Sequence, residues 1–88
     1  MIVSFDRDAW EDYRHWQAAD RVILERLNAL TEECRRHPFK GTGKPEALKG
    51  DFAGFWSRRI TQEHRLVYSV SGKGESQTLQ IAQCRYHY

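Results

Sequence analysis

The last four residues of the sequence combine three kinds of group that can do chemistry or bind. They are Arg85, Tyr86, His87 and Tyr88. An imidazole has a reference pKa of about 6.5 and can donate a proton at neutral pH. A guanidinium binds phosphate through paired hydrogen bonds, and phenol rings can stack on unpaired bases. Residues 79–84 have the pattern of a strand, which predicts a positioned ending; the alternative is a tail that only packs across a sheet edge.

A single carboxylate lies among cations in the middle of the chain. Glu46 is one of four acidic residues after residue 34, and Lys44 and Lys49 are close to it in sequence. Neighbouring positive charge favours the ionised form of a carboxylate, which could then accept a proton beside an RNA phosphate. The alternative is that Glu46 is an ordinary exposed glutamate in a loop.

Four arginines in the second half form a third candidate group: Arg58, Arg59, Arg65 and Arg85. A guanidinium can bind phosphate and stabilise charge that develops on it. Because side chains alternate along a strand, Arg58 and Arg59 should point to opposite faces unless the strand bulges. For any one arginine, surface solubility or a salt bridge to Glu63 or Asp51 is the simpler interpretation.

Zinc binding is a competing interpretation of two pairs with C-x-x-H spacing. They are Cys34 with His37 and Cys84 with His87. Residues three apart on a strand point to opposite faces, so the second pair could not share an ion without a bend. The spacing also departs from standard zinc motifs, and we predict neither a metal nor another cofactor. The sequence has no phosphate-binding P-loop, dinucleotide-binding glycine motif or nucleophile elbow.

The charge of the chain is divided unevenly along its length. The net charge of the 88 residues is +2, but residues 1–34 carry four Arg and eight Asp or Glu, whereas residues 35–88 carry ten Lys or Arg and four Asp or Glu. Such asymmetry predicts a polyanionic partner for the second half, and a solvated basic surface is the alternative. No apolar run approaches the ~20 residues of a membrane span. With no signal peptide and no disulfide spacing, we expect a cytoplasmic protein that does not contact a membrane.

Periodicity and turn residues predict the elements that must position these groups. Asp6 or Asp8, and then Asp20, can cap two helices, because a carboxylate satisfies free amides at a helix start. Pro38 ends the second helix. Two glycines and a proline punctuate residues 39–50, which indicates a loop. Strands are expected at residues 2–5, 55–60, 65–70 and 78–86, with turns at 61–64 and 71–75.

These elements predict an α+β fold. Sequential strands with short connections pair antiparallel, so we expect an N-terminal helical hairpin packed on one face of a twisted antiparallel sheet. The cations should gather on the other face of that sheet. Because the chain is short, residues 1–88 should form a single domain around one small core.

Four segments closely resemble the YoeB/Txe toxins, which belong to the RelE/ParE superfamily of bacterial toxin–antitoxin systems. They are residues 44–49, 54–60, 63–68 and 84–88, and residues 10–13 and 16–17 are similar to the first helix of the family. The resemblance covers essentially the whole chain. It implies a RelE-like fold of the microbial ribonuclease kind.

The resemblance also implies a function. It implies the toxin of a type II system, an endoribonuclease that enters the A site of the 70S ribosome, cleaves the mRNA there and inhibits translation without a metal. A cognate antitoxin is the implied partner, and a homodimer is compatible with the resemblance. The turn at residues 71–76 looks longer than usual for the family. Because it lies away from the matching segments, we expect it to affect contacts with partners rather than the chemistry.

Residue roles carry over by position. Glu46 would be the general base, Arg65 the transition-state stabiliser and His87 the general acid. The residues implied to contact the substrate or RNA are Tyr88, Lys49, Arg59, Lys44 and Tyr86. Two other classes stay open: a ParE-like toxin acting on DNA gyrase, and a non-catalytic module that binds RNA or an antitoxin. The combined acid–base set argues against the gyrase class, which needs no such set.

Overall fold

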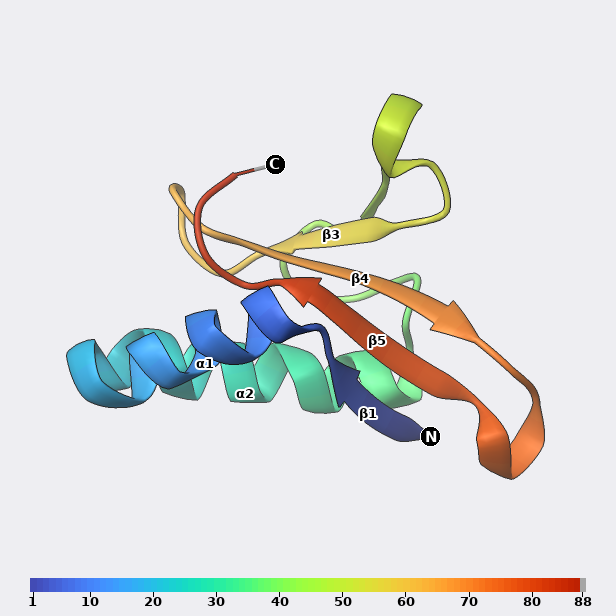
Figure 1. The fold of residues 1–88 in the computed structure, drawn as a ribbon. Helices are drawn as coiled ribbons and strands as arrows, with labels where there is room; N and C mark the ends of the chain where they lie inside the picture. Colours follow the sequence, from blue (N-terminus) through green and yellow to red (C-terminus); the bar gives the residue numbers. More distant parts are fainter. Residues whose placement is uncertain (88) are drawn as a thin grey trace.

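The computed structural model describes residues 1–87 and shows two helices packed against a sheet (Figure 1). The elements are β1 (Ile2–Phe5), α1 (Arg7–Ala19), α2 (Arg21–Arg36), β2 (Glu46–Ala47), the 3-10 turn η1 (Gly50–Phe52), β3 (Trp56–Arg59), β4 (Arg65–Ser71), the 3-10 turn η2 (Gly74–Ser76) and β5 (Thr78–Gln83). Neither helix is long and apolar enough to cross a membrane. The predicted helical hairpin and α+β class are confirmed.

The five described strands lie in the order β1-β5-β4-β3-β2. The pairs β2–β3, β3–β4 and β4–β5 are antiparallel, as predicted. The prediction of a wholly antiparallel sheet is wrong for β1, which runs parallel to β5 with Ile2 opposite Thr78. The rule of antiparallel pairing holds for strands joined by short turns, whereas almost the entire chain separates these two strands. The sheet is therefore mixed.

The helix ends follow the predicted signals in part. The carboxylate of Asp20 accepts a hydrogen bond from the backbone N–H of Ile23 at 3.1 Å and so caps α2. Asp6 occupies the N-cap position of α1 but makes no capping bond, because its carboxylate accepts from the side-chain amide of Gln80 instead. Helix α2 ends at Arg36, two residues before Pro38.

The core lies between the helices and one face of the sheet. Its helical side includes Trp16, Leu27 and Leu30, and its sheet side includes Leu66 and Leu79, all at most 5% exposed. Removing these side chains from water is the main driving force for the fold, at about 25 cal/mol per Å² of apolar surface. The helices therefore occupy one face and leave the opposite face of the sheet for the site.

Arg58 points into this core, while its neighbour Arg59 is exposed. The predicted alternation is confirmed, but Arg58 cannot be the surface phosphate binder that the sequence allowed. All five of its N–H donors have acceptors. They are the hydroxyl of Tyr68 at 3.2 Å, Oε1 of Glu33 at 3.1 Å, and the carbonyls of Thr42 at 3.1 Å, Lys40 at 2.8 Å and His37.

These bonds tie the chain after α2 to the core. The hydroxyl of Tyr68 donates in turn to the carbonyl of Pro38 at 2.5 Å, and burial raises its pKa to about 12. Glu33 accepts from the backbone N–H of Thr42 at 2.6 Å, and that bond lowers the pKa of its carboxyl. Residues 37–42 are thereby fixed on the path that leads to β2.

Replacing Arg58 by leucine should destabilise the protein strongly. The change removes the donor from the carbonyls of His37, Lys40 and Thr42, and a buried acceptor left without its partner costs about 1–3 kcal/mol. Urea denaturation should show this as a lower midpoint. Arg59→Leu is the matched control on the exposed side of β3 and should change the free energy of unfolding by no more than about 0.5 kcal/mol. Equal effects of the two changes would contradict the anchoring role of Arg58.

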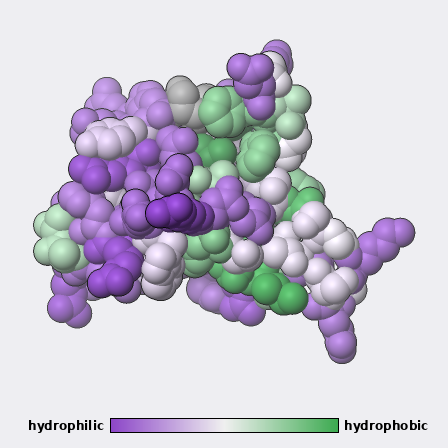
Figure 2. Space-filling model, viewed as in Figure 1, coloured by the Kyte–Doolittle hydropathy of each residue, from purple (hydrophilic) through white to green (hydrophobic). Residues whose placement is uncertain are grey.

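Exposed apolar surface gathers in two regions of the hydropathy view (Figure 2). One lies over β1, where Ile2 is 53% exposed, next to a cavity of about 440 Å³ lined by Val3, Phe5, Trp10, Tyr13, Asn28, Thr31 and Glu32. The second lies near η1, where Phe52 is exposed. Most of the remaining visible surface is hydrophilic.

Candidate functional site

The strand register places three of the predicted site residues on the face of the sheet that the helices leave uncovered. Glu46 is opposite Ser57, Ser57 is opposite Val67, and Arg59 is opposite Arg65. Directly opposed residues share a face, and so do alternate residues of one strand. Glu46, Arg59 and Arg65 therefore share one face, with the buried Ser57 and Val67 between them, whereas Arg58 faces the helices.

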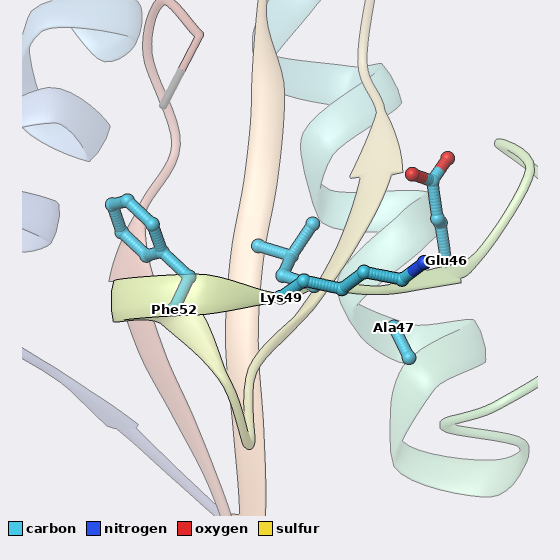
Figure 3. A pocket seen from close by; sticks show the side chains of 5 residues that line it. Glu46, Ala47, Lys49 and Phe52 are labelled. Carbon is cyan, nitrogen blue, oxygen red and sulfur yellow. The ribbon is translucent and has the colours of Figure 1, made fainter.

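Glu46 is exposed on β2, at the mouth of a cavity of about 250 Å³ lined by Glu46, Ala47, Leu48, Lys49 and Phe52 (Figure 3). In this view Glu46 and the ring of Phe52 lie at opposite ends of the lining, and the side chain of Lys49 extends toward Glu46. The predicted loop at residues 39–50 thus contains a two-residue strand, which pairing with β3 reveals. A strand this short carries no periodicity that the sequence could display.

Arg65 begins β4 and its guanidinium folds back over the preceding turn. Its Nη1 donates to the carbonyls of Thr61 at 2.8 Å, Gln62 at 2.9 Å and His64 at 3.1 Å. Sheet spacings of about 4.8 Å between strands and 3.4 Å between residues put the Cα atoms of Glu46 and Arg65 about 12 Å apart. Two long side chains can reach a phosphate group from both sides of such a gap.

His87 joins this site from the C-terminal tail, by which we mean residues 84–87. Its Nε2 lies 3.2 Å from the carbonyl oxygen of Gln62, the same atom that accepts from Arg65 Nη1 at 2.9 Å. Two contacts of these lengths on one oxygen place Nη1 and Nε2 no more than about 6 Å apart. Arg65 and His87, which are 22 positions apart in sequence, therefore meet beside the turn between β3 and β4.

The tail continues beyond the last strand and is held mainly by side chains of other elements. The prediction of a strand to residue 86 is wrong, because β5 ends at Gln83. Next to it, the backbone N–H of Cys84 donates to the carboxylate of Asp12 at 3.2 Å, and the Cys84 carbonyl accepts from Nε1 of Trp16 at 2.9 Å. Burial raises the pKa of Asp12, against the opposing effect of that Cys84 hydrogen bond. Figure 1 shows the tail curving back toward the turn between β3 and β4.

Tyr86 is fixed through its backbone. Its N–H donates to Nδ1 of His64 at 2.8 Å, and its carbonyl accepts from the N–H of Arg65 at 3.0 Å. Its φ of +63° is the left-handed conformation that few non-glycine residues adopt. Tyr86 is 53% exposed, and the guanidinium of Arg85 lies 4.7 Å from the centre of its ring and 5.8 Å from the centre of the Trp16 ring.

The remaining predicted residues have simpler positions. Lys44, Lys49 and Arg59 are exposed, and Lys49 lines the cavity next to Glu46. Tyr88 lies outside the described residues. Within residues 1–87, no three His, Cys, Asp or Glu side chains come together as a metal site.

The two members of the C-terminal C-x-x-H pair lie in different surroundings. The thiol of Cys84 is buried against the carbonyl of Ala9 at 3.5 Å, and burial raises its pKa to about 12. His87 is exposed and contacts Gln62.

Sequence reasoning missed three residues that hold the tail in place. It placed Trp16 in the first helix and His64 in the turn at residues 61–64, and it gave Asp12 no role of its own. All three lie far from the tail in sequence, so only the fold brings them to it. The one available signal was that the carboxylate of Asp12 and the indole N–H of Trp16 both need polar partners if they are buried.

Comparison with known proteins places this geometry in a family. The profile described as the YoeB-like toxin of bacterial type II toxin–antitoxin systems matches residues 5–88. Toxin YoeB from Escherichia coli strain K12 is 50% identical over 88 residues, with the whole of both chains covered. A solved YoeB/ParE toxin from Agrobacterium tumefaciens is 52% identical, covers both chains fully and superposes with a TM-score of 0.96.

A third relative has been solved in two assemblies. YoeB from Staphylococcus aureus is known in a heterotetrameric complex with the antitoxin YefM and as a dimer. In both it is 39% identical, covers 100% of this chain and 98% of its own, and has a TM-score of 0.88. The family resemblance seen in the sequence is confirmed. The chain therefore belongs to the YoeB-like toxins of bacterial type II toxin–antitoxin systems.

Proposed function

We propose that this toxin is a ribosome-dependent endoribonuclease that cleaves mRNA in the ribosomal A site and so inhibits translation. The observation that carries the proposal is the meeting of Arg65 and His87 on the Gln62 carbonyl, on a sheet that also presents Glu46. A proton acceptor, a fixed cation and a proton donor are the groups that RNA cleavage by its own 2′-hydroxyl requires.

In the first part of the reaction, Glu46 takes the proton of the ribose 2′-hydroxyl. The 2′-oxygen then attacks the adjacent phosphorus in line with the 5′-oxygen that will leave. Arg65 stabilises the additional negative charge on the phosphorane-like transition state. Because the turn holds Nη1 of Arg65, the other edge of its guanidinium would face the phosphate.

In the second part, the bond between phosphorus and the 5′-oxygen breaks and His87 protonates that oxygen. The imidazolium has two N–H groups, and the Gln62 carbonyl orients the one on Nε2. The proton on Nδ1 would therefore be the one transferred. The products are a 2′,3′-cyclic phosphate and a 5′-hydroxyl end, and no step needs a metal or another cofactor.

Binding would use the surrounding cations and aromatic rings. We assign Lys44, Lys49 and Arg59 to backbone phosphates because all three are exposed. Lys49 lines the cavity next to Glu46, and Arg59 shares the sheet face of Glu46. Tyr86 and Tyr88 would contact bases by stacking. The ribosome would hold the mRNA in the reactive geometry, which is worth more than any one side chain.

The partners follow from this assignment. We propose a cognate antitoxin, by analogy with the S. aureus YoeB–YefM complex. We expect it to cover the basic face and block the tail. A homodimer is proposed by analogy with the S. aureus dimer. The site of action would be the cytoplasm, where ribosomes and mRNA are found.

A cleavage assay on translating ribosomes tests the proposal. Glu46→Ala and His87→Ala should each slow cleavage by about 10²-fold or more, because each removes one proton-transfer group. Lys73→Ala, in the turn before η2, is the matched control and should cleave like the wild type. Gyrase inhibition that survives both changes would favour a ParE-like toxin, and RNA or antitoxin binding without any cleavage would favour a non-catalytic module.

A further inference from the structure

The residue before His87 is held by two neighbours at the end of the turn between β3 and β4. His64 is only 8% exposed, and its Nδ1 accepts from the Tyr86 N–H at 2.8 Å. The N–H of Arg65 donates to the Tyr86 carbonyl at 3.0 Å. Both backbone polar groups of Tyr86 are thus bonded to consecutive residues. The direction in which the chain enters His87 depends on this pair of bonds.

We propose that His64 is a positioning residue for His87, and that it acts as a neutral hydrogen-bond acceptor for the Tyr86 backbone. Its catalytic consequence rests on the proposed role of His87 as proton donor. The left-handed φ of +63° at Tyr86 is a conformation that surrounding contacts must hold. Losing the bond to His64 would release that conformation and move His87 away from Gln62.

Packing fixes the orientation of the His64 ring. The ring lies edge-on to Trp16, with 4.7 Å between centres, and 5.5 Å from the ring of Tyr86. With Nδ1 as acceptor, the proton of the neutral ring is on Nε2, which lies 3.6 Å from a carboxylate oxygen of Glu63. A proton added to Nδ1 would point at the Tyr86 N–H, so two donors would oppose each other. Protonation of His64 should therefore break this bond and release the backbone of Tyr86.

The charged groups around His64 shift its pKa in both directions. Burial is the largest effect and lowers the pKa of His64; Glu63 opposes it, whereas Arg85, His15 and His87 lower the pKa further. These groups come from the turn, the tail and helix α1. Because the folded-state pKa is below the unfolded value of about 6.5, the bond is fully present above that pH and is lost as the pH falls through the folded-state pKa.

Hydrogen exchange at the Tyr86 amide tests the inference directly on the free toxin. The protection factor, which corrects for the intrinsic effect of pH on exchange, should fall at least about 10-fold in the wild type between about pH 7.5 and pH 5. His64→Asn places an amide oxygen close to the position of Nδ1 and cannot be protonated, so it should keep the protection within about threefold over the same range. His64→Leu has no acceptor and should show low protection throughout.

A matched control separates His64 from its histidine neighbour. His15 packs on the same indole, with 4.8 Å between ring centres, and His15→Asn removes this second imidazole without touching the Tyr86 bond. It should lose Tyr86 protection at low pH as the wild type does. A wild-type level of protection in His64→Leu at pH 7.5, or a wild-type pH response in His64→Asn, would overturn the proposal. If His64→Leu does not fold, the pH response of His64→Asn still tests the proposal.

The cleavage assay gives the catalytic consequence. At about pH 7.5, His64→Leu should cleave about 10- to 100-fold more slowly with unchanged ribosome binding, because a misplaced catalytic group is costly. His64→Asn should stay within about threefold of the wild type. Equal rates for His64→Leu and the wild type would overturn the positioning role. If the wild type does not cleave at all, the proposed function fails, while the exchange experiment still decides how the tail is held.

Discussion

A single 2′-deoxy substitution at the scissile nucleotide should abolish cleavage by this toxin. The proposed nucleophile is the ribose 2′-oxygen, and no side chain near Glu46 replaces it in the scheme. Removing that atom leaves Glu46 with no proton to accept and the phosphate with no attacking group. The measurement is single-turnover cleavage of an mRNA programmed in the A site, with and without the modification.

The matched substrate carries the 2′-deoxy group one nucleotide away from the scissile position. It should be cut at close to the normal rate, since Lys44, Lys49 and Arg59 would bind phosphates rather than that hydroxyl. Continued cutting at the modified scissile position would rule out attack by the 2′-oxygen, and with it the assignment of Glu46 as general base. If neither modified substrate is cleaved, the ribose hydroxyls would also have a role in binding.

Deleting residues 87 and 88 should leave the fold intact and remove most of the activity. The contacts that hold the tail, made by Asp12, Trp16 and His64, end at Cys84 and Tyr86. The shortened chain keeps all of them, so the urea midpoint should change little. Cleavage should fall toward the upper end of the ~10²–10⁴-fold range for an acid catalyst, because Tyr88 is lost together with His87.

His87→Gln in the full-length chain is the companion variant. It keeps a hydrogen-bonding side chain near Gln62 but removes the transferable proton, so it should lose activity without any change in stability. Full activity of the shortened chain would show that His87 is not the general acid. A large drop in the stability of the shortened chain would instead show that the last two residues stabilise the fold.

Local rules predicted most of the fold because they act within single elements. Periodicity predicted helix α2, Asp20 marked its start, and Pro38 marked where it must stop. Strand alternation correctly separated Arg58 from Arg59. It could not show which of the two would be buried, since that depends on α2 and residues 37–42, which supply the acceptors of Arg58.

The site was only partly predictable, for a related reason. Residue types pointed to Glu46, Arg65 and His87, but nothing local showed that one carbonyl would join the last two. The sequence of the tail continues the strand pattern of β5, but its backbone does not stay in the sheet. Asp12 and Trp16 of α1 form the hydrogen bonds of the Cys84 backbone in place of a neighbouring strand. Such hydrogen bonds link residues about 70 positions apart and leave no periodic trace.

The parallel pairing of β1 with β5 sets the order of events when the protein is made. Strand β5 lies between β1 and β4, and Ile2 pairs with Thr78. A growing chain therefore carries an unpaired first strand until residues 78–83 have been synthesised. Folds dominated by such distant contacts form slowly compared with helical ones. We expect the sheet, and any toxicity that depends on it, to arise only after translation has passed β5, so incomplete chains should be harmless to the cell that makes them.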